Sequence, residues 1–197
     1  MTTIGKFSKT QGVQYEDPLT LFYYNASRYI SNKTVIHPNI ITTLRLIIMI
    51  GLTISFYYKK YTIIMALLVQ LCWFLDHLDG DMARNHNLIT KFGDYYDHIV
   101  DVTYLLPLYV ILIYRLYAKP GFIVLLLFLI LLNITTSLLI SCQEKLFHKK
   151  NKNTGSYMLQ LLSSICNLDK NHLRILKFFG GSTLMLYIGV LMIYVNY

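Results

Sequence analysis

Aspartate residues at helical spacing are the part of this chain best suited to chemistry. Six of its ten acidic residues fall in one short stretch, as Asp76, Asp79, Asp81, Asp94, Asp97 and Asp101. Strongly apolar sequence flanks this stretch on both sides. Carboxylates at a membrane boundary are costly unless cations pair with them, so they indicate a functional site by default.

The spacing of these aspartates predicts how they come together. Asp79 follows Asp76 by three residues, and Asp101 follows Asp97 by four. Each spacing places both carboxylates on one face of a helix, and two antiparallel helices joined by the connection 85–92 can turn those faces toward each other. The converging oxygens suit hard divalent ions such as Mg²⁺ or Mn²⁺. Two such ions about 3.5 to 4 Å apart clamp the attacking and leaving oxygens in phosphoryl transfer.

Small residues and one arginine accompany the aspartates. Gly80, Ala83 and Gly93 leave room for a bulky ligand or a neighbouring helix to approach the backbone. Arg84 supplies a cation for phosphate oxygens. The stretch therefore predicts a phosphoryl-transfer site that uses two divalent cations.

The whole pattern resembles the signature of the CDP-alcohol phosphotransferase family. Its defining positions are all filled, by Asp76, Asp79, Gly80, Ala83, Arg84, Gly93, Asp97 and Asp101. The resemblance implies a six-helix membrane enzyme in which an alcohol attacks a cytidine diphosphate-linked donor, forming a phosphodiester and releasing CMP. It also implies that Asp76, Asp79, Asp97 and Asp101 hold the metals, and that Gly80, Ala83, Arg84 and Gly93 lie at the nucleotide and diphosphate site.

The start of the first apolar segment resembles one branch of that family, the choline and ethanolamine phosphotransferases. Residues 38–42 read Pro-Asn-Ile-Ile-Thr, which is similar to the Pro-Asn-x-Ile-Thr of the branch. We therefore expect Asn39, Thr42 and Arg45 to lie at the substrate site. Arg45 falls inside a predicted membrane helix, so we expect it to pair with an aspartate or the substrate diphosphate, the alternative being that it snorkels to the interface.

A second motif of the same branch surrounds a histidine. Residues 93–98 read Gly-Asp-Tyr-Tyr-Asp-His, which resembles Gly-Glu-x-x-Asp-His with Asp94 in place of the glutamate. Asp94 lies four residues before His98, so its carboxylate can orient the imidazole as a general base for the acceptor hydroxyl. The alternative is that His98 is only an interfacial polar residue, in which case Asp101 is the base.

These branch motifs favour transfer from CDP-choline or CDP-ethanolamine to diacylglycerol. The length of 197 residues is a departure, because eukaryotic members of the branch are longer and have additional C-terminal helices. Compact length resembles relatives that transfer a phosphatidyl group from CDP-diacylglycerol to inositol, glycerol phosphate or serine, which is the alternative. A non-enzymatic ion-binding or transport protein is a remote alternative, since it does not need the small residues and Arg84 in register. The family resemblance also allows a homodimer.

Composition places these residues in a membrane protein. Hydrophobic residues make up 55% of the chain and charged residues 14%, which is too apolar for a soluble domain of this size. The net charge of +8 arises mostly between apolar segments, where topology and anionic lipid headgroups explain it better than nucleic acid does. Cys72, Cys142 and Cys166 are scattered and odd in number, which indicates neither a disulfide framework nor a zinc site.

The apolar segments predict an all-α polytopic membrane helix bundle in a single domain, residues 1–197. We expect transmembrane helices over residues 39–58, 61–84, 93–117, 121–142 and 175–197, with a weaker span or re-entrant segment at 156–168. This makes six spans, with five as the alternative. A leader, residues 1–37, carries an interfacial amphipathic helix over residues 18–30 and precedes the transmembrane core, residues 38–197.

The distribution of Lys and Arg predicts the orientation. More of them fall on the side that carries the N-terminus, which favours a cytoplasmic N-terminus. With six spans, both termini and the aspartate site then face the cytoplasm, from an endomembrane such as the endoplasmic reticulum in a eukaryote or the plasma membrane in a prokaryote. His77 and Asp81 lie off the face shared by the other aspartates, so we expect them to be solvated.

Overall fold

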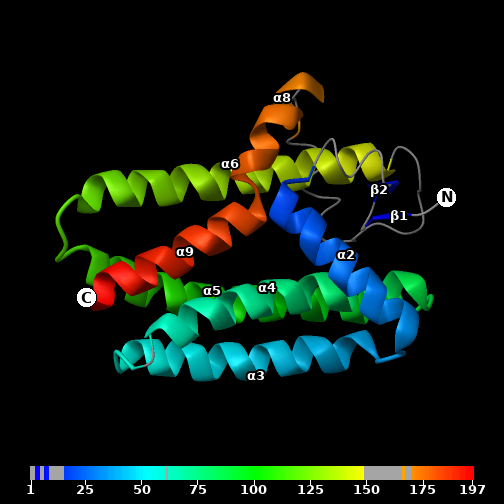
Figure 1. The fold of residues 1–197 in the computed structure, drawn as a ribbon, viewed down its shortest axis with the longest axis horizontal. Coiled ribbons are helices and arrows are strands. Elements are labelled where there is room, and N and C mark those ends of the chain that lie inside the picture. The colour runs from blue at the N-terminus through cyan, green and yellow to red at the C-terminus, as the bar shows by residue number, and fades with distance from the viewer. Residues whose placement is uncertain (1–2, 5–6, 9–15, 61, 149–165, 167–169) are drawn as a thin grey trace.

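Helices form nearly all of the described chain in the computed structural model (Figure 1). The structure describes residues 3–4, 7–8, 16–60, 62–148, 166 and 170–197. Two short strands, β1 (Thr3–Ile4) and β2 (Phe7–Ser8), pair antiparallel near the N-terminus. The prediction of a polytopic helical bundle is confirmed.

Five helical segments of the described chain are long and apolar enough to cross a membrane. They are α3 (Pro38–Tyr57), α4 (Thr62–Asn85), α5 (Lys91–Leu116), the apolar part of α6 (Phe122–His148), and a composite of α8 (Lys170–Leu176), η2 (Lys177–Phe179) and α9 (Gly181–Asn196). The first four begin and end within a few residues of the predicted spans. The predicted segment at 156–168 lies outside the described residues.

Local capping explains where the site-bearing helices begin. Pro38 occupies the first turn of α3, where its missing N–H costs nothing, and Asn39 N–H donates to His37 Nδ1 over 3.3 Å. Thr90 caps α5, because its Oγ1 accepts from Gly93 N–H at 2.9 Å. This cap lets α5 start at Lys91, two residues before the predicted start, so the first turn of α5 faces the end of α4.

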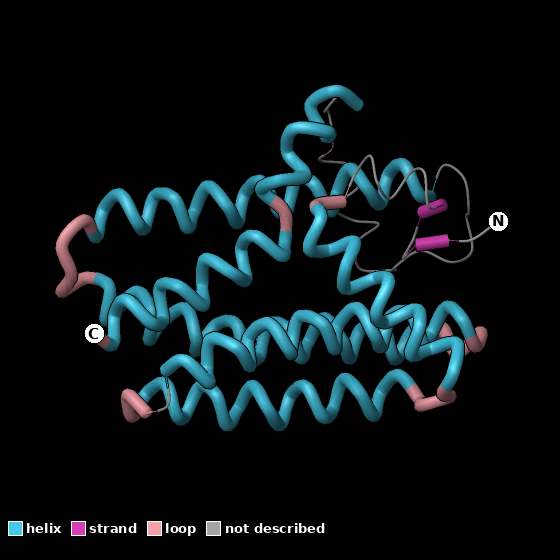
Figure 2. The backbone as a smooth tube through the Cα atoms, viewed as in Figure 1, coloured by secondary structure: helices cyan, strands magenta, loops and turns pink. Residues whose placement is uncertain are grey.

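The helices pack in two parts with α9 between them (Figure 2). Helix α3 packs against both α4 and α5, and α9 packs against α4, α5 and α6. In α9 and its preceding turns, 56% of the apolar window is buried, against 28–39% in the other four segments. The main core joins side chains such as Met49, Val69, Leu112, Leu132 and Ile188 from these five helices. Helix α9 is therefore the central helix that braces the others.

The two ends of the bundle differ, and the start of α3, the end of α4 and the start of α5 share one of them, called here the carboxylate end. The last turn of α9 lies at the opposite end, where Asn196 Nδ2 donates to Thr62 Oγ1 over 3.0 Å and Tyr194 OH donates to Pro120 O over 3.0 Å. The C-terminus therefore does not share a face with the aspartates (Figure 1). Five candidate spans lie among the described residues. The expected cytoplasmic placement of both termini and of the aspartate site stays a prediction.

The predicted final helix, residues 175–197, is interrupted in the structure. Helix α8 ends at Leu176, a 3-10 turn follows, and α9 starts only after Gly180, whose backbone is extended. At the start of α9, a Cβ on Gly181 would lie 2.4 Å from the Trp73 ring, so only glycine permits this approach of α9 to α4. The break thus brings the start of α9 beside the carboxylate end.

A disulfide joins Cys142 of α6 to Cys166, 24 residues later, and Lys145 Nζ donates to Cys166 O over 2.7 Å. Cys72 is free and buried. The expectation that the cysteines are not paired is therefore wrong for two of the three. Sequence spacing missed the pair because Cys142 and Cys166, 24 residues apart, meet only in the folded chain.

The leader contains α2 (Pro18–Lys33), slightly longer than predicted. Asp17 caps it, since one carboxylate oxygen accepts from Leu19 N–H and Thr20 N–H, each at 2.9 Å. The buried face carries Thr20, Tyr23, Ser27 and Ser31 and packs against α4, while Phe22 and Tyr29 are exposed. Exposed aromatic side chains suit a membrane interface, and the interfacial position of α2 stays a prediction.

Candidate active site

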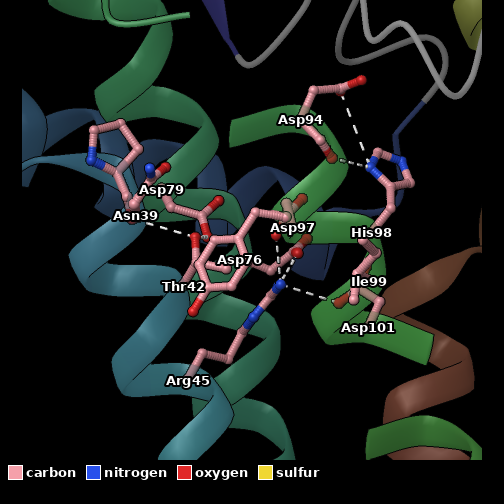
Figure 3. Close-up of polar contacts among 12 residues, drawn as sticks. Asn39, Thr42, Arg45, Asp76, Asp79, Asp94, Asp97, His98, Ile99 and Asp101 are labelled. Carbon is pink, nitrogen blue, oxygen red and sulfur yellow. Dashed lines mark hydrogen bonds and ion pairs between the residues drawn. The ribbon is translucent and has the colours of Figure 1, made fainter. Parts of the chain in front are cut away.

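Arg45 is the centre of the predicted site (Figure 3). Its fully buried guanidinium pairs with Asp76 through Nη1, while Nη2 lies 2.5 Å from Asp97 Oδ1 and 3.0 Å from Asp101 Oδ1. Asp76 comes from α4, whereas Asp97 and Asp101 come from α5, so one cation from α3 ties three helices together. The expected pairing of Arg45 with an aspartate is confirmed, and snorkelling to the interface is excluded by its burial.

The fourth signature aspartate, Asp79, takes a separate position beside this group. It is 4% exposed, and Thr42 Oγ1 donates to its Oδ2 over 2.8 Å. The same hydroxyl lies 3.2 Å from Pro38 O, one turn earlier in α3. Thr42, expected at the substrate site, therefore holds a predicted metal ligand in place.

The three carboxylates around Arg45 have donor atoms that could hold a metal ion. One oxygen each from Asp76, Asp97 and Asp101 lies within 4.8 Å of the other two. Oxygens on opposite sides of a Mg²⁺ ion lie about 4.2 Å apart, since each Mg–O distance is about 2.1 Å. Three oxygens cannot all lie opposite one another, so these would draw closer together to hold a hard divalent cation, and Arg45 would have to withdraw to admit one.

His98 is held by a main-chain group of the first turn of α5. Its Nδ1 lies 2.7 Å from the main-chain oxygen of Asp94 and 4.0 Å from the Oδ1 of the same residue. The imidazole is therefore oriented by a hydrogen bond to the Asp94 carbonyl, whereas the Asp94 carboxylate, which was expected to orient it, lies too far away to accept one. With Nδ1–H donating, Nε2 is left as the basic nitrogen, which a general base requires. The base assignments, to His98 or to Asp101, stay predictions.

The Arg84 guanidinium lies over Gly80 and is held by an ion pair with Asp81. Its Nη2 donates to Asp81 Oδ1 over 2.9 Å, and Ser27 of α2 donates to the other oxygen of Asp81. A Cβ on Gly80 would lie 3.1 Å from both Nη atoms, tighter than ordinary contacts, so the missing side chain gives the guanidinium its place. Arg84 Nε is buried with no hydrogen-bond partner among the described residues.

Gly93 plays a similar part where α3 meets α5. A Cβ there would lie 3.0 Å from Thr90 Oγ1 and 3.2 Å from Asn39 Oδ1. Gly93 therefore admits the Asn39 amide of α3 to the first turn of α5. These contacts bring Asn39 and Gly93, both expected at the substrate site, to the same place.

A cavity of about 440 Å³ joins these parts. Every signature residue lines it, as do Asn39, Thr42, Asp94 and His98. Residues outside the signature also line the cavity, among them Glu16, Asp17, Tyr24, Trp73 and His77. Burial, followed by the nearby Glu16 carboxylate, raises the pKa of the Tyr24 phenol well above its ordinary value, so Tyr24 stays a neutral donor.

A comparison with family models decides what kind of protein carries this geometry. The model of the CDP-alcohol phosphatidyltransferases matches residues 35–195. The chain belongs to the CDP-alcohol phosphatidyltransferase family. No curated protein and no solved structure matches it.

Membership in the CDP-alcohol phosphatidyltransferase family establishes the reaction class. The chain is an enzyme of phospholipid synthesis that transfers a substituted phosphate group from a CDP-alcohol. The matched range spans α3 to α9, so the whole described transmembrane bundle belongs to the family domain. The family uses a divalent metal, and the aspartate group around Arg45 supplies ligands of the right chemistry.

Two residues of this CDP-alcohol phosphatidyltransferase lie where the sequence interpretation did not expect them. Asp81 is fully buried between Arg84 and Ser27, and His77 is 7% exposed with Nδ1 2.9 Å from Trp73 O. The expectation that both are solvated is wrong, because α2 covers the face of α4 that points away from the aspartates. The sequence signal for this burial is the set of hydroxyl residues Thr20, Ser27 and Ser31, which share one face of α2 and suit a helix packed on a polar surface.

Proposed function

We propose that the chain transfers a phosphorylated aminoalcohol, phosphocholine or phosphoethanolamine, from its cytidine diphosphate donor to diacylglycerol. The family establishes transfer from a CDP-alcohol, and the cavity supports the finer assignment. The observation that carries the proposal is one cavity lined both by the signature residues and by further carboxyl-bearing and aromatic residues.

The carboxylates near Arg45 are the proposed metal ligands. Asp76, Asp97 and Asp101 present three oxygens close together, and Asp79 lies beside them on its bond from Thr42. Two divalent cations, Mg²⁺ or Mn²⁺, would neutralise the diphosphate and polarise the phosphorus that is attacked. Asp97, Asp101 and His98 line the same cavity, so the proposed metal ligands and the proposed base would act on one bound donor and acceptor.

Residues of this chain supply the remaining parts of the reaction. Arg84 donates to diphosphate oxygens from its fixed place above Gly80, with Ala83 beside it on the cavity wall. His98 accepts the proton of the attacking hydroxyl at Nε2, because Nδ1 is engaged by the Asp94 carbonyl. Asn39 and Gly93 shape the wall between α3 and α5.

The lining residues outside the signature support a cationic alcohol on the donor. Glu16 and Asp17, 6% and 4% exposed, line the cavity, with the Asp17 carboxylate also capping α2. Trp73 and Tyr24 line it too, and their rings stand 5.0 and 4.7 Å from the His77 ring. Carboxylates and the faces of Trp and Tyr attract ammonium groups. Choline and ethanolamine carry such a group, as does serine in the alternative class, whereas inositol is neutral and glycerol phosphate is anionic.

A donor and acceptor panel with identification of the product lipid tests the assignment. Purified protein with Mg²⁺ or Mn²⁺ is offered CDP-choline or CDP-ethanolamine with diacylglycerol, and separately CDP-diacylglycerol with inositol, glycerol phosphate or serine. We expect CMP and a zwitterionic lipid from the first set only. Product from CDP-diacylglycerol alone would replace the proposed substrates by the alternative class and leave the family reaction intact.

The domain and the membrane placement complete the proposal. We infer one catalytic domain, with the leader as its covering helix, in a membrane whose cytoplasmic face carries the carboxylate end. Arg28 and Lys33 of α2 lie at this end, in agreement with the positive-inside rule. Diacylglycerol and other membrane lipids reach the cavity from the bilayer, and a homodimer is compatible with this arrangement.

A further inference from the structure

The residues that hold the Arg84 guanidinium, Asp81 and Ser27, belong neither to the metal site nor to the signature. Asp81 is fully buried on α4, and its two carboxylate oxygens face different elements. One oxygen accepts from Arg84 Nη2 at 2.9 Å, and the other accepts from Ser27 Oγ of α2. Ser27 is fully buried as well, so water cannot take over its part.

Apart from the ion pair with Asp81, few contacts fix the orientation of the Arg84 guanidinium. Gly80 offers only the space left by a missing Cβ, and Arg84 Nε has no hydrogen-bond partner among the described residues. A guanidinium carries several N–H donors in a rigid fork, so fixing one Nη against Asp81 aims the others. Arg84 lines the cavity, and the aimed donors are available to an anion there.

We propose that Asp81 and Ser27 are positioning residues, which fix the Arg84 guanidinium for the diphosphate of the donor and make the affinity of that site depend on α2. The inference rests on the proposed function, because it assumes that a nucleoside diphosphate binds beside Arg84. It adds that the leader helix, although it carries no signature residue, contributes to donor binding through one hydrogen bond.

The chain offers a closely matched control for Ser27. Ser31 lies one turn later on the same face of α2 and is also fully buried. Each serine Oγ lies near the main-chain oxygen three residues earlier, at 3.1 Å for Ser27 and 3.3 Å for Ser31. Each also contacts a polar side chain of α4, but Ser31 contacts Asn85 instead of Asp81. Loss of either hydroxyl therefore perturbs the contact between α2 and α4 to a similar extent. Of the two serines, Ser27 alone hydrogen-bonds the carboxylate that holds Arg84.

The test measures the dissociation constant of CDP, which keeps both phosphates and does not react, by titration of the full-length protein in detergent with Mg²⁺. We expect Ser27→Ala to weaken CDP binding about three- to tenfold, the effect of one hydrogen bond, and Ser31→Ala to change it less than about twofold. Asp81→Asn, which keeps the shape and removes the charge, weakens it by about tenfold or more.

An Arg84→Lys background shows whether the effect passes through Arg84. In the Arg84→Lys protein, Ser27→Ala should weaken CDP binding no further, since the guanidinium that Asp81 holds is already absent. Equal effects of Ser27→Ala and Ser31→Ala, or an undiminished effect of Ser27→Ala in Arg84→Lys, overturn this inference alone. Absence of CDP binding to the wild-type protein overturns the proposed function and the inference with it.

Discussion

Replacing Arg45 with methionine removes the only cation that contacts the three carboxylates among the described residues. Two charges 4.8 Å apart repel by about 3.5 kcal/mol at an effective dielectric constant of 20, and the three carboxylates form three pairs with oxygens no farther apart than this. Removing one partner of a buried ion pair costs about 3–5 kcal/mol, which is the more direct guide. We therefore expect Arg45→Met to lose about 3–5 kcal/mol of stability in EDTA, or roughly 6–20 °C in Tm.

Divalent cations should reverse most of this loss. In Arg45→Met, Mg²⁺ or Mn²⁺ no longer competes with the guanidinium for the oxygens of Asp76, Asp97 and Asp101. A metal at about 100 times its Kd contributes about 2.7 kcal/mol. Thermal unfolding in detergent, with EDTA and with increasing Mg²⁺, should show a larger rise in Tm for Arg45→Met than for the wild type.

Arg115 supplies the matched control at the opposite end of the bundle. Its guanidinium contacts Asn196 Oδ1 and, over 2.8 Å, Tyr57 O, and it forms no ion pair among the described residues. Arg115→Met should lower Tm equally in EDTA and in Mg²⁺. If Arg45→Met behaves in the same metal-independent way, the carboxylates around Arg45 are not a cation site and the reasoning fails.

Three further changes test separate parts of the site. His98→Ala should lower kcat by about 10² to 10⁴ if Nε2 takes the proton, and near-normal turnover would leave Asp101 as the base. Thr42→Val removes the hydrogen bond to Asp79, so we expect about a tenfold loss of CMP release and about 1 kcal/mol of stability. Gly181→Ala should cost about 1–3 kcal/mol in thermal unfolding, because the new methyl group meets the Trp73 ring.

Two of these changes have controls in α3. Among the described residues, Thr53 Oγ1 donates only within its own helix, to Met49 O, so Thr53→Val should leave CMP release near the wild-type rate. A Cβ on Gly51 meets nothing within 4 Å, so Gly51→Ala should not lower stability. Equal loss of CMP release in Thr42→Val and Thr53→Val, or equal unfolding of Gly181→Ala and Gly51→Ala, would contradict the roles given to these contacts.

The sequence predicted well those features that depend on local spacing. Apolar length set the spans of α3 to α6, and helical spacing placed Asp97 and Asp101 on one face. The charge of Arg45 inside an apolar segment predicted a carboxylate partner, because an unpaired cation there is expensive. Each of these follows from residues within one helix or from a strong energetic demand.

Features that depend on the packing of a neighbouring helix could not be predicted from local spacing. Asp81 lies off the aspartate face, and only the packing of α2 decides that it is buried against Ser27 instead of solvated. The break before α9 lies in continuous apolar sequence, and the Gly180-Gly181 pair gains its meaning only from the position of Trp73. The position of the end of α9, away from the aspartates, depends on its contacts with Thr62 and Pro120, which no local spacing indicates.

CMP release by purified protein, with and without divalent cations, tests the central claim most directly. With a cytidine diphosphate donor and its acceptor, we expect CMP only when Mg²⁺ or Mn²⁺ is present, and none from Asp97→Asn, which loses one of the three grouped carboxylates. Release of CMP in EDTA, or at the wild-type rate from Asp97→Asn, would contradict a metal-dependent transfer at this aspartate group.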